Sequence, residues 1–300
     1  MRETELVALI RKLTTRAPSQ PQIIQSIGDD CAILRPRPNE DLVFTTDFVI
    51  EGRHFTLDTH KPADIGYKAL GRSLSDLAAM GSEPLFCLVS LAVPAAFAPR
   101  WIQNFYRGLL ALAAYYKITV AGGDLARFDK VVADVICCGR VPRGKAILRS
   151  GARPGDRIFV TGQLGGSAHG FRTRTGAAWR GHLHPEPRIP AGMALRKLGV
   201  RAGMDLSDGL ALDLYRLCLE SKVSAEIGSN LPIAPGATED EALHGGEDYE
   251  LLFTAPPQLT IPPRIAKVSV TGIGRITRGK PGTIRYGGRI LPPKGFDHFT

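Results

Sequence analysis

WIQNFYRGLLALAAYYKITVAGGD, residues 101–124, places a helix, a strand and a carboxylate in direct succession. Apolar side chains recur three or four positions apart, as on one face of a helix, at Ile102, Phe105, Leu109, Leu112 and Tyr116. Residues 118–121 follow as a short apolar strand that runs into two glycines and Asp124. A helix that leads at once into a buried strand predicts a mixed α/β or α+β fold.

The same alternation continues in both directions from this stretch. Hydrophobic periodicity predicts helices at residues 3–14 and 62–80, one that ends near Gly199 and one that begins at Leu210. Strands are expected at residues 42–48, 85–93, 131–141, 157–161, 249–254 and 268–273. Residues 176–190 show no such pattern and are expected to form an irregular loop.

A change in composition divides the chain near its middle. Residues 142–156 are rich in glycine, proline and arginine, which is typical of a linker between two folded regions. We therefore expect domains at residues 1–142 and 143–300. A chain of 300 residues is long enough for two cores.

The composition is that of a soluble globular protein, with 44% hydrophobic and 22% charged residues. The apolar runs fall far short of the roughly 20 residues that a membrane-spanning helix needs, so no membrane association is expected. Residues 3–14 carry charges of both signs, which is unlike a secretory signal and favours the cytoplasm. The five cysteines are scattered without a C-x-x-C pair and are expected to be small buried side chains.

The net charge of +9 raises the question of nucleic-acid binding. Lysine and arginine are dispersed, however, without a run of five or six, so no nucleic-acid partner is expected. A basic protein is also suited to attracting anionic phosphates.

Aspartates recur where predicted elements begin or end. They are Asp29 and Asp30 after Gly28, Asp47 after two threonines, Asp76 in a helix, Asp124 after two glycines, and Asp205 with Asp208 before a helix. Clustered carboxylates repel each other unless cations neutralise them, and oxygen ligands without histidine or cysteine favour Mg²⁺. Each aspartate alone could also end a strand or cap a helix, so only their convergence would make a metal site.

Two glycine-containing motifs do not fit the phosphate sites that they resemble. GRVPRGKA at residues 139–146 has P-loop spacing, but Ala146 stands where a hydroxyl should hold Mg²⁺ and Pro142 removes a backbone N–H. In the segment from Gly272 to Thr277, the threonine takes the place of the third glycine of a dinucleotide fingerprint. Neither motif supports a nucleotide site.

Eight motifs in order along the chain resemble the thiamine-monophosphate kinase family, which belongs to the superfamily related to aminoimidazole ribonucleotide (AIR) synthetase. They are IGDDCA (27–32), TTDFVIEGRHF (45–55), LSDLAAMGSEP (74–84), AGGD (121–124), LRSGARPGD (148–156), DLSDGL (205–210), GGEDYEL (245–251) and KGFDHF (294–299). The resemblance spans nearly the whole chain. It departs from the family at Leu125 and Ala126, where threonine is usual, and at Arg72, where asparagine is common.

The resemblance implies an enzyme that phosphorylates thiamine phosphate to thiamine diphosphate, with ATP as co-substrate and several Mg²⁺ ions. Transfer would be direct and in line, without a phospho-enzyme. It also implies a two-domain AIR-synthetase-like fold and a homodimer. In that fold, the N-terminal sheets of two subunits pair into a barrel at the dimer interface, and the C-terminal domain is α/β.

By motif, the resemblance assigns three sets of site residues. The metal shell would be Asp30, Thr45, Thr46, Asp47, Asp76, Asp124, Asp205 and Asp208, of which Asp30, Asp47, Asp76, Asp124 and Asp208 would be catalytic. ATP would contact Tyr106, Gly123, Asp124, Arg149 and Ser207. Thiamine phosphate would face His54, Glu247 and Phe296.

Two other functions stay open at this point. A synthetase of the same superfamily could activate a different acceptor with ATP, but such an acceptor gives Glu247 and Phe296 no cationic ring to bind. A non-catalytic protein could bind nucleotide or thiamine diphosphate as a sensor, although binding alone would need fewer carboxylates. Loss of turnover in Asp30→Asn would separate an enzyme from such a sensor.

Overall fold

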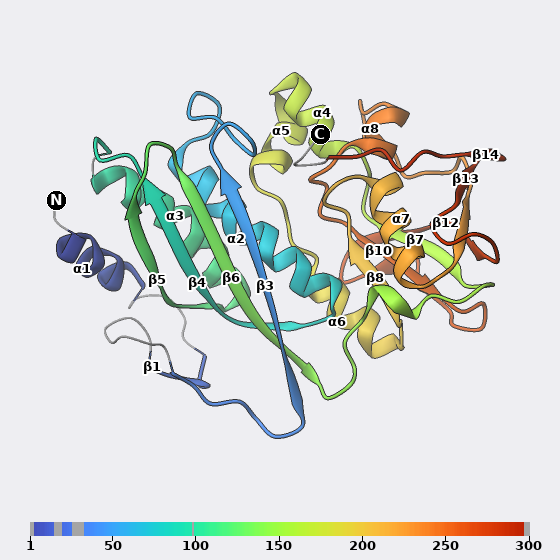
Figure 1. Cartoon of the computed structure of the whole chain (residues 1–300), viewed down its shortest axis with the longest axis horizontal. Coiled ribbons are helices and arrows are strands. Elements are labelled where there is room, and N and C mark those ends of the chain that lie inside the picture. The colour runs from blue at the N-terminus through green and yellow to red at the C-terminus, as the bar shows by residue number, and fades with distance from the viewer. Residues whose placement is uncertain (1–2, 15–19, 26–32, 98, 297–300) are drawn as a thin grey trace. The chain divides into compact units, whose positions relative to one another are not determined.

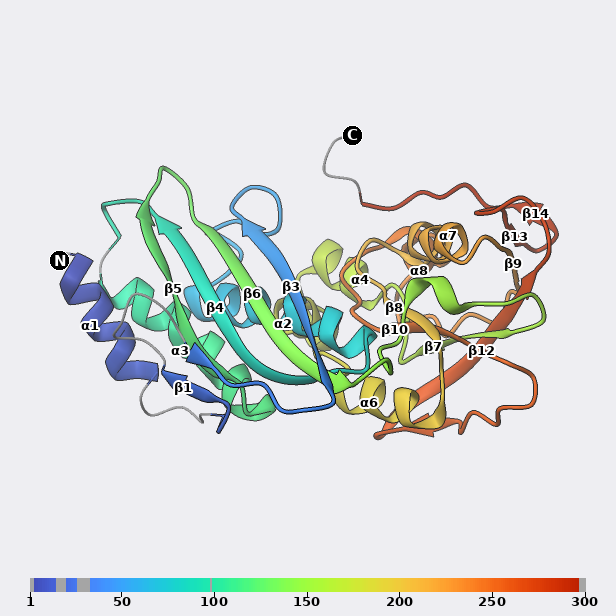
Figure 2. The same cartoon turned by 60° about the horizontal axis from the view of Figure 1, so that its bottom comes forward.

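The computed structural model of the chain describes residues 3–14, 20–25, 33–97 and 99–296. The chain divides into two compact units, of which the first comprises Met1–Leu77 and Glu83–Gly144 and the second Ala78–Ser82 and Lys145–Thr300. Each unit has its own main sheet (Figures 1 and 2).

The first unit contains α1 (Glu3–Thr14), β1 (Ile23–Gln25), β2 (Ile33–Leu34), β3 (Glu40–Ile50), most of α2 (Pro62–Ala79), β4 (Glu83–Val93), α3 (Pro99–Tyr116), β5 (Thr119–Arg127) and β6 (Val132–Pro142). Its main sheet has the order β3-β6-β4-β5, with β4 and β5 parallel and the other pairs antiparallel. The predicted elements at 3–14, 42–48, 62–80, 85–93 and 131–141 are confirmed within a few residues at each end.

Helices α2 and α3 lie on the same side of this sheet in both ribbon views (Figures 1 and 2). The Ser73 hydroxyl of α2 donates a hydrogen bond to the Val135 carbonyl of β6 at 2.7 Å. Apolar side chains of the helices, including Leu74 and Leu109, are fully buried. This packing fixes the face of α2 that carries Asp76.

The opposite side of the sheet is more exposed. Phe44 and Phe48 of β3 are 59% and 54% exposed, and β3 is an outer strand of the sheet. Within the described part of a single chain the sheet is open, so no closed barrel is formed by one chain alone.

The second unit contains η1 (Arg149–Gly151), β7 (Arg157–Thr161), α4 (Gly166–Thr173), α5 (Gly176–Leu183), α6 (Ile189–Leu198), β8 (Ala202–Asp205), α7 (Leu210–Glu220), β9 (Ser224–Ile227), α8 (Glu239–His244), β10 (Leu251–Ala255), β11 (Arg264–Ile265), β12 (Val268–Thr277), β13 (Ile284–Tyr286) and β14 (Arg289–Ile290). The sheet order is β14-β13-β9-β12-β7-β10-β8, and β11 pairs with β12. The predicted strand at 157–161 and the helix start at Leu210 are confirmed.

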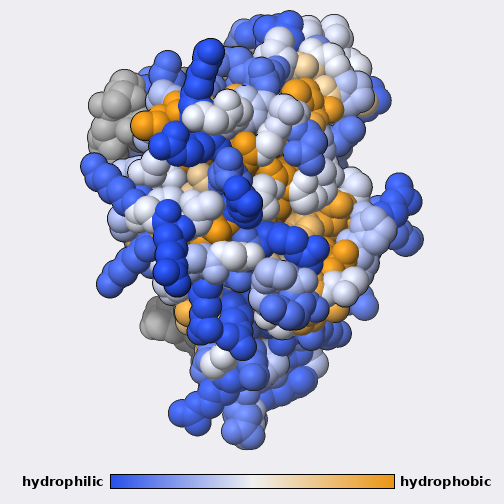
Figure 3. Space-filling model, turned by 90° about the vertical axis from the view of Figure 1, so that its right-hand side faces the viewer, coloured by the Kyte–Doolittle hydropathy of each residue, from blue (hydrophilic) through white to orange (hydrophobic). Residues whose placement is uncertain are grey.

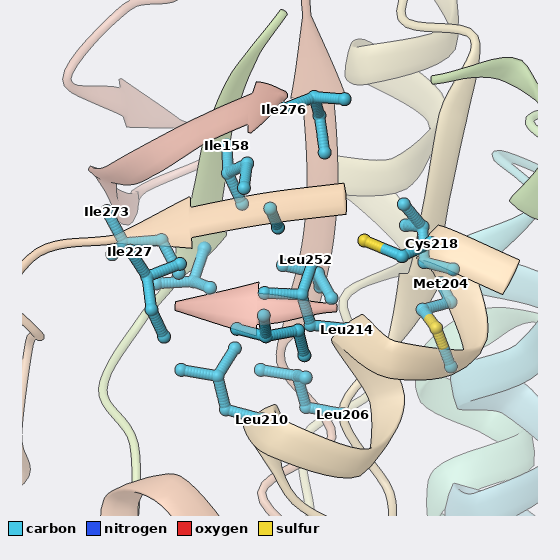
Figure 4. Close-up of a cluster of buried hydrophobic side chains, with 14 of the residues drawn as sticks. Ile158, Met204, Leu206, Leu210, Leu214, Cys218, Ile227, Leu252, Ile273 and Ile276 are labelled. Atoms are coloured by element: carbon cyan, nitrogen blue, oxygen red, sulfur yellow. The ribbon is translucent and has the colours of Figure 1, made fainter. Parts of the chain in front are cut away.

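The core of the second unit supports the segment that carries the predicted site residues. Met204 and Leu206, which flank Asp205, are buried together with Leu210 and Leu214 of α7 (Figure 4). Each fully buried leucine contributes about 1.5–3 kcal/mol to the free energy of folding relative to an exposed one. The backbone from residue 204 to 210 is therefore anchored on both sides of the site.

The prediction of an irregular loop at 176–190 is wrong, because α5 and the start of α6 occupy most of it. Two glycines in GAAWRGHL lower its helix propensity, and its single leucine gives no apolar stripe. Tertiary contacts stabilise this helix instead. His182 of α5 forms a 2.8 Å hydrogen bond with Ser167 of α4, and its ring centroid lies 5.3 Å from that of Phe171 of α4.

The surface of the molecule seen from the side of β13 and β14 is mainly hydrophilic, with hydrophobic residues gathered in a discontinuous band (Figure 3). Across the described part of the chain, the helices are too short or too polar to cross a lipid bilayer. Four of the cysteines, Cys87, Cys137, Cys138 and Cys218, are buried free thiols as expected, and Cys31 lies outside the described residues.

Candidate functional site

The first unit brings several of the predicted metal ligands together. Thr45, Thr46 and Asp47 lie on β3, and Asp76 lies on α2. The Thr45 hydroxyl donates to the Asp76 carboxylate, and the Thr46 hydroxyl donates to Asp134 of β6. These side-chain bonds join β3 to α2 and to β6, so they hold the hydroxyl and carboxylate oxygen atoms in fixed positions.

Asp47 shows the electrostatic strain of this cluster. Its pKa is raised to about 6, mainly by burial; Arg72 acts in the opposite direction, and the neighbouring Asp76 and Asp134 contribute to the rise. The Arg72 Nη2 atom lies 3.5 Å from Asp47 Oδ1. Carboxylates that raise one another's pKa favour a bound cation, and their hard oxygen atoms fit Mg²⁺.

The other predicted residues of the first unit lie on separate elements. Asp124 is exposed on β5, and a side chain at Gly123 would come within 2.0 Å of the Val89 carbonyl. Tyr106 is only 2% exposed on α3, and burial raises its pKa. The backbone N–H of Ile50 donates to His54 Nδ1 at 3.0 Å, so Nε2 carries the ring proton. Asp29 and Asp30 lie outside the described residues.

The second unit joins four of its predicted residues through the backbone. The Glu247 N–H donates to the Ser207 carbonyl at 2.8 Å, and the Phe296 N–H donates to the Asp208 carbonyl at 3.0 Å. Asp205, 3% exposed, ends β8 just before this loop. Residues that are up to 89 positions apart in the sequence thus meet around one turn.

Arg149 lies apart from this turn in the same unit. It begins η1 and is exposed, and its carbonyl accepts a 2.6 Å hydrogen bond from the Ser221 hydroxyl. That bond fixes the backbone of Arg149 and leaves its guanidinium at the surface.

Two residues that the sequence analysis did not select organise this turn. The Asp213 carboxylate accepts hydrogen bonds from the N–H groups of Ser207, Asp208 and Gly209 at 3.1, 3.0 and 3.1 Å. Arg216 pairs with Asp208 and, at 3.0 Å, with Asp213. Burial raises the pKa of Asp213 to about 6. An aspartate in the first turn of α7 was the available sequence signal, because backbone N–H groups gather at helix starts.

Glu247 has a partner that sequence reasoning also missed. His182 Nδ1 lies 3.5 Å from Glu247 Oε2 and 2.8 Å from Ser167 Oγ. The next residue, Asp248, accepts hydrogen bonds from the N–H groups of Gly165 and Ser167 at 2.6 and 3.0 Å. Helices α4 and α5 therefore support the loop that presents Glu247.

Gly246 is required by the close approach of these two loops. A Cβ atom at this position would lie 2.5 Å from the Ser207 carbonyl oxygen. We expect Gly246→Ala to push the loops apart and to lower the free energy of unfolding by about 1–3 kcal/mol, measured by urea denaturation. Gly181→Ala in α5 is the control, because its Cβ meets nothing within 4 Å and alanine favours the helix by about 0.5–1 kcal/mol. Equal effects of the two substitutions would contradict this account.

The described carboxylates do not form a closed ligand shell. Among the described residues, no three histidine, cysteine, aspartate or glutamate side chains form a group able to hold a metal by themselves. Mg²⁺ usually retains waters and is bound through one or two carboxylates together with substrate phosphates. The donor set fits that mode of binding.

Comparison with known proteins gives consistent matches. The family described as AIR synthase related protein, N-terminal domain, matches residues 28–141. Thiamine-monophosphate kinase of Salmonella typhimurium is 37% identical, with 94% of each chain covered. The crystal structure of thiamine-monophosphate kinase from Stenotrophomonas maltophilia K279a has a TM-score of 0.83 at 36% identity, covering 97% of this chain and 98% of that one. AaThiL complexed with AMPPCP and TMP has a TM-score of 0.80 at 33% identity, covering 100% and 99%.

Proposed function

The chain belongs to the family of thiamine-monophosphate kinases, and from this premise we propose that it transfers the γ-phosphoryl group of ATP to thiamine phosphate, which gives thiamine diphosphate. The observation that carries the proposal is the similarity over the whole chain to AaThiL, which is complexed with AMPPCP and TMP. The relatives named above are kinases, which favours this function over a synthetase for another acceptor or a sensor.

We assign the metal-binding role to the aspartates and threonines on β3, α2, β5 and β8 and in the turn before α7. They are Thr45, Thr46, Asp47, Asp76, Asp124, Asp205 and Asp208, with Asp30 added by motif. When bound, several Mg²⁺ ions neutralise the charge of the ATP phosphates, which is the main requirement of phosphoryl transfer. The mutual repulsion at Asp47 supports this assignment, since a cation relieves it.

ATP is assigned to Tyr106, Gly123, Asp124, Arg149 and Ser207. The exposed guanidinium of Arg149 has the planar donor geometry that binds phosphate oxygens in pairs. Asp213 supports Ser207 by holding the N–H groups of the turn, so the hydroxyl is presented from a fixed backbone. Tyr106, which is buried on α3, is assigned to ATP by the resemblance to the family.

Thiamine phosphate is assigned to His54, Glu247 and Phe296. The thiazolium ring is cationic, so the Glu247 carboxylate offsets its charge and the 40% exposed Phe296 ring offers a stacking surface. The proton on His54 Nε2 makes this nitrogen a donor, which suits a phosphate oxygen. The acceptor phosphate oxygen attacks the γ-phosphorus directly, and no side chain is phosphorylated.

Coupled ADP release tests the function with purified protein, ATP, MgCl₂ and thiamine phosphate. We expect ADP to form in proportion to thiamine diphosphate, and chelation of Mg²⁺ to stop the reaction. Folded protein that releases no ADP above the control without thiamine phosphate would contradict the proposal. Equal release with thiamine would indicate another acceptor.

A homodimer is part of the proposal, with the β3-β6-β4-β5 sheets of two chains pairing into a barrel. The outer strand β3 and its exposed Phe44 and Phe48 support this pairing, because unpaired edges and exposed aromatic residues are typical of an interface. We further propose residues 1–142 and 143–300 as the functional domains and the cytoplasm as the location of the enzyme.

Replacing both Phe44 and Phe48 by glutamate should separate the dimer. Charges at these positions would be buried without partners in the interface, which costs several kcal/mol per ion. Sedimentation equilibrium should change from about twice the chain mass of 32.4 kDa to a single chain. Phe128→Glu is the control, because Phe128 is 51% exposed but lies in the loop after β5. A double variant that remains dimeric would exclude this face as the interface.

A further inference from the structure

Arg72 of α2 lies on a carboxylate that the proposed function uses for Mg²⁺. Its Nη2 atom is 3.5 Å from Asp47 Oδ1, and the two side chains are only 12% and 25% exposed. An arginine side chain does not lose its proton in a protein. A permanent positive charge is therefore held against the carboxylate to which the proposed function assigns a metal ion.

The surroundings explain why a cation is held there. Asp76 and Asp134 lie close enough to Asp47 to disfavour its negative charge, and Arg72 favours that charge. Opposite charges this close attract each other more strongly in a partly buried site than in water, so one guanidinium can offset a neighbouring carboxylate. Arg72 thus balances part of the charge that Mg²⁺ would otherwise have to balance.

The second unit contains a similar pair. Arg216 of α7 contacts Asp208, another of the carboxylates assigned to metal, and also lies 3.0 Å from Asp213. In both units a helix arginine pairs with an aspartate outside that helix. Arg72 of α2 pairs with Asp47 of β3, and Arg216 of α7 pairs with Asp208, which precedes α7. The Arg72 pair is the more buried of the two.

We propose that Arg72 is an internal counter-cation of Asp47, which stabilises the carboxylate cluster in the absence of metal and competes with Mg²⁺ for it. The nucleotide-free protein then binds Mg²⁺ weakly, and the ion gains enough ligands only together with the ATP phosphates. This inference rests on the proposed function, because it treats Asp47 as a Mg²⁺ ligand. It makes Arg72 a positioning residue that sets the order in which metal and nucleotide are bound.

Calorimetric titration of MgCl₂ into nucleotide-free protein tests the competition. We expect Arg72→Leu to bind Mg²⁺ at least about tenfold more tightly than the wild type, because the competing charge is gone. Arg72→Lys keeps the charge and should stay within about threefold of the wild type. Arg100→Leu, at an exposed arginine of α3, should change nothing. Equal Mg²⁺ affinities of the wild type and Arg72→Leu would overturn the inference.

A thermodynamic cycle shows whether Asp47 is the contested ligand. In an Asp47→Asn background, Arg72→Leu should no longer increase the Mg²⁺ affinity, and a gain that persists there would overturn the pairing. Thermal unfolding tests the inference even if Arg72→Leu is unstable in the absence of metal. In EDTA, Arg72→Leu should melt below the wild type, and millimolar Mg²⁺ should restore its Tm. A Tm that Mg²⁺ does not raise would also overturn the inference.

These outcomes are separable from failure of the proposed function. A folded wild-type protein that never phosphorylates thiamine phosphate would remove the function. Equal Mg²⁺ affinities in a protein that does turn over thiamine phosphate would remove only the role of Arg72.

Discussion

Asp47→Asn should lower kcat for thiamine phosphate by about a thousandfold, which corresponds to about 4 kcal/mol of transition-state stabilisation. The amide keeps the shape of the side chain but supplies one neutral oxygen in place of a carboxylate. In the proposed site, the side chain at position 47 would bind a Mg²⁺ ion that neutralises the charge of the ATP phosphates. The loss should therefore appear in kcat even at saturating Mg²⁺.

The same substitution should leave the protein folded, and this separates a catalytic from a structural role. Burial beside Asp76 and Asp134 raises the pKa of Asp47 to about 6, so its ionised form is disfavoured in the folded chain. Without metal, the contribution of Asp47 to the free energy of unfolding is therefore greatest when its carboxyl group is protonated. This contribution declines as the pH rises from about 4 to 6. Asp47→Asn should remove that decline. Asp129→Asn, at an exposed aspartate of the same unit, should keep both activity and pH dependence. An Asp47→Asn enzyme of nearly normal kcat would contradict the metal assignment.

Arg188→Leu is expected to be the most destabilising single change in the second unit. Arg188 forms two hydrogen bonds with Glu250, at 2.6 and 2.9 Å, and the Glu250 side chain is only 6% exposed. The Thr161 hydroxyl also donates to Glu250, at 2.6 Å. Removing the arginine leaves a buried carboxylate without its cation, which typically costs about 3–5 kcal/mol. Urea unfolding can be followed by Trp179 fluorescence in a Trp101→Phe background.

Two further variants give this prediction its controls. Glu250→Gln in the Arg188→Leu background should recover most of the loss, because no buried charge remains. Arg172→Leu removes a similar two-bond pair with Glu241, but there the arginine is 53% exposed and water replaces the contact. We expect only a small shift of the unfolding midpoint. If Arg172→Leu and Arg188→Leu have equal effects, burial does not determine the strength of these pairs.

The elements predicted correctly were those with long and regular patterns. Helix α2 was expected at 62–80 and is found at Pro62–Ala79, because a proline marks its start and an apolar stripe runs its full length. Helix α5 was missed because contacts with α4 stabilise it. Local sequence carries no trace of the contacts that His182 makes with Ser167 and Phe171 of α4.

Site residues could be selected by motif, but their partners could not. Asp47 and Asp76 were selected from the sequence, whereas Arg72, which lies between them in the chain, was not, since nothing in its neighbours marks a salt bridge to β3. Asp213 and Arg216 were missed for a related reason. Their contacts depend on how the turn before α7 closes, and a helical pattern shows only which face of α7 is apolar.

The five residues Ala78–Ser82 prevent the two units from being separated by a single cut in the chain. They stand between segments of the first unit in the sequence, yet they belong to the second. The Met80 carbonyl accepts a hydrogen bond from the Ile147 N–H at 3.1 Å, and the Gly81 carbonyl accepts one from Arg196 at 2.7 Å. The second unit is discontinuous in sequence, so a fragment that begins at residue 143 would lack these two carbonyl acceptors. Replacing the second unit with that of a related protein would therefore require the exchange of two separate segments. During synthesis, the first segment is completed more than sixty residues before the second begins.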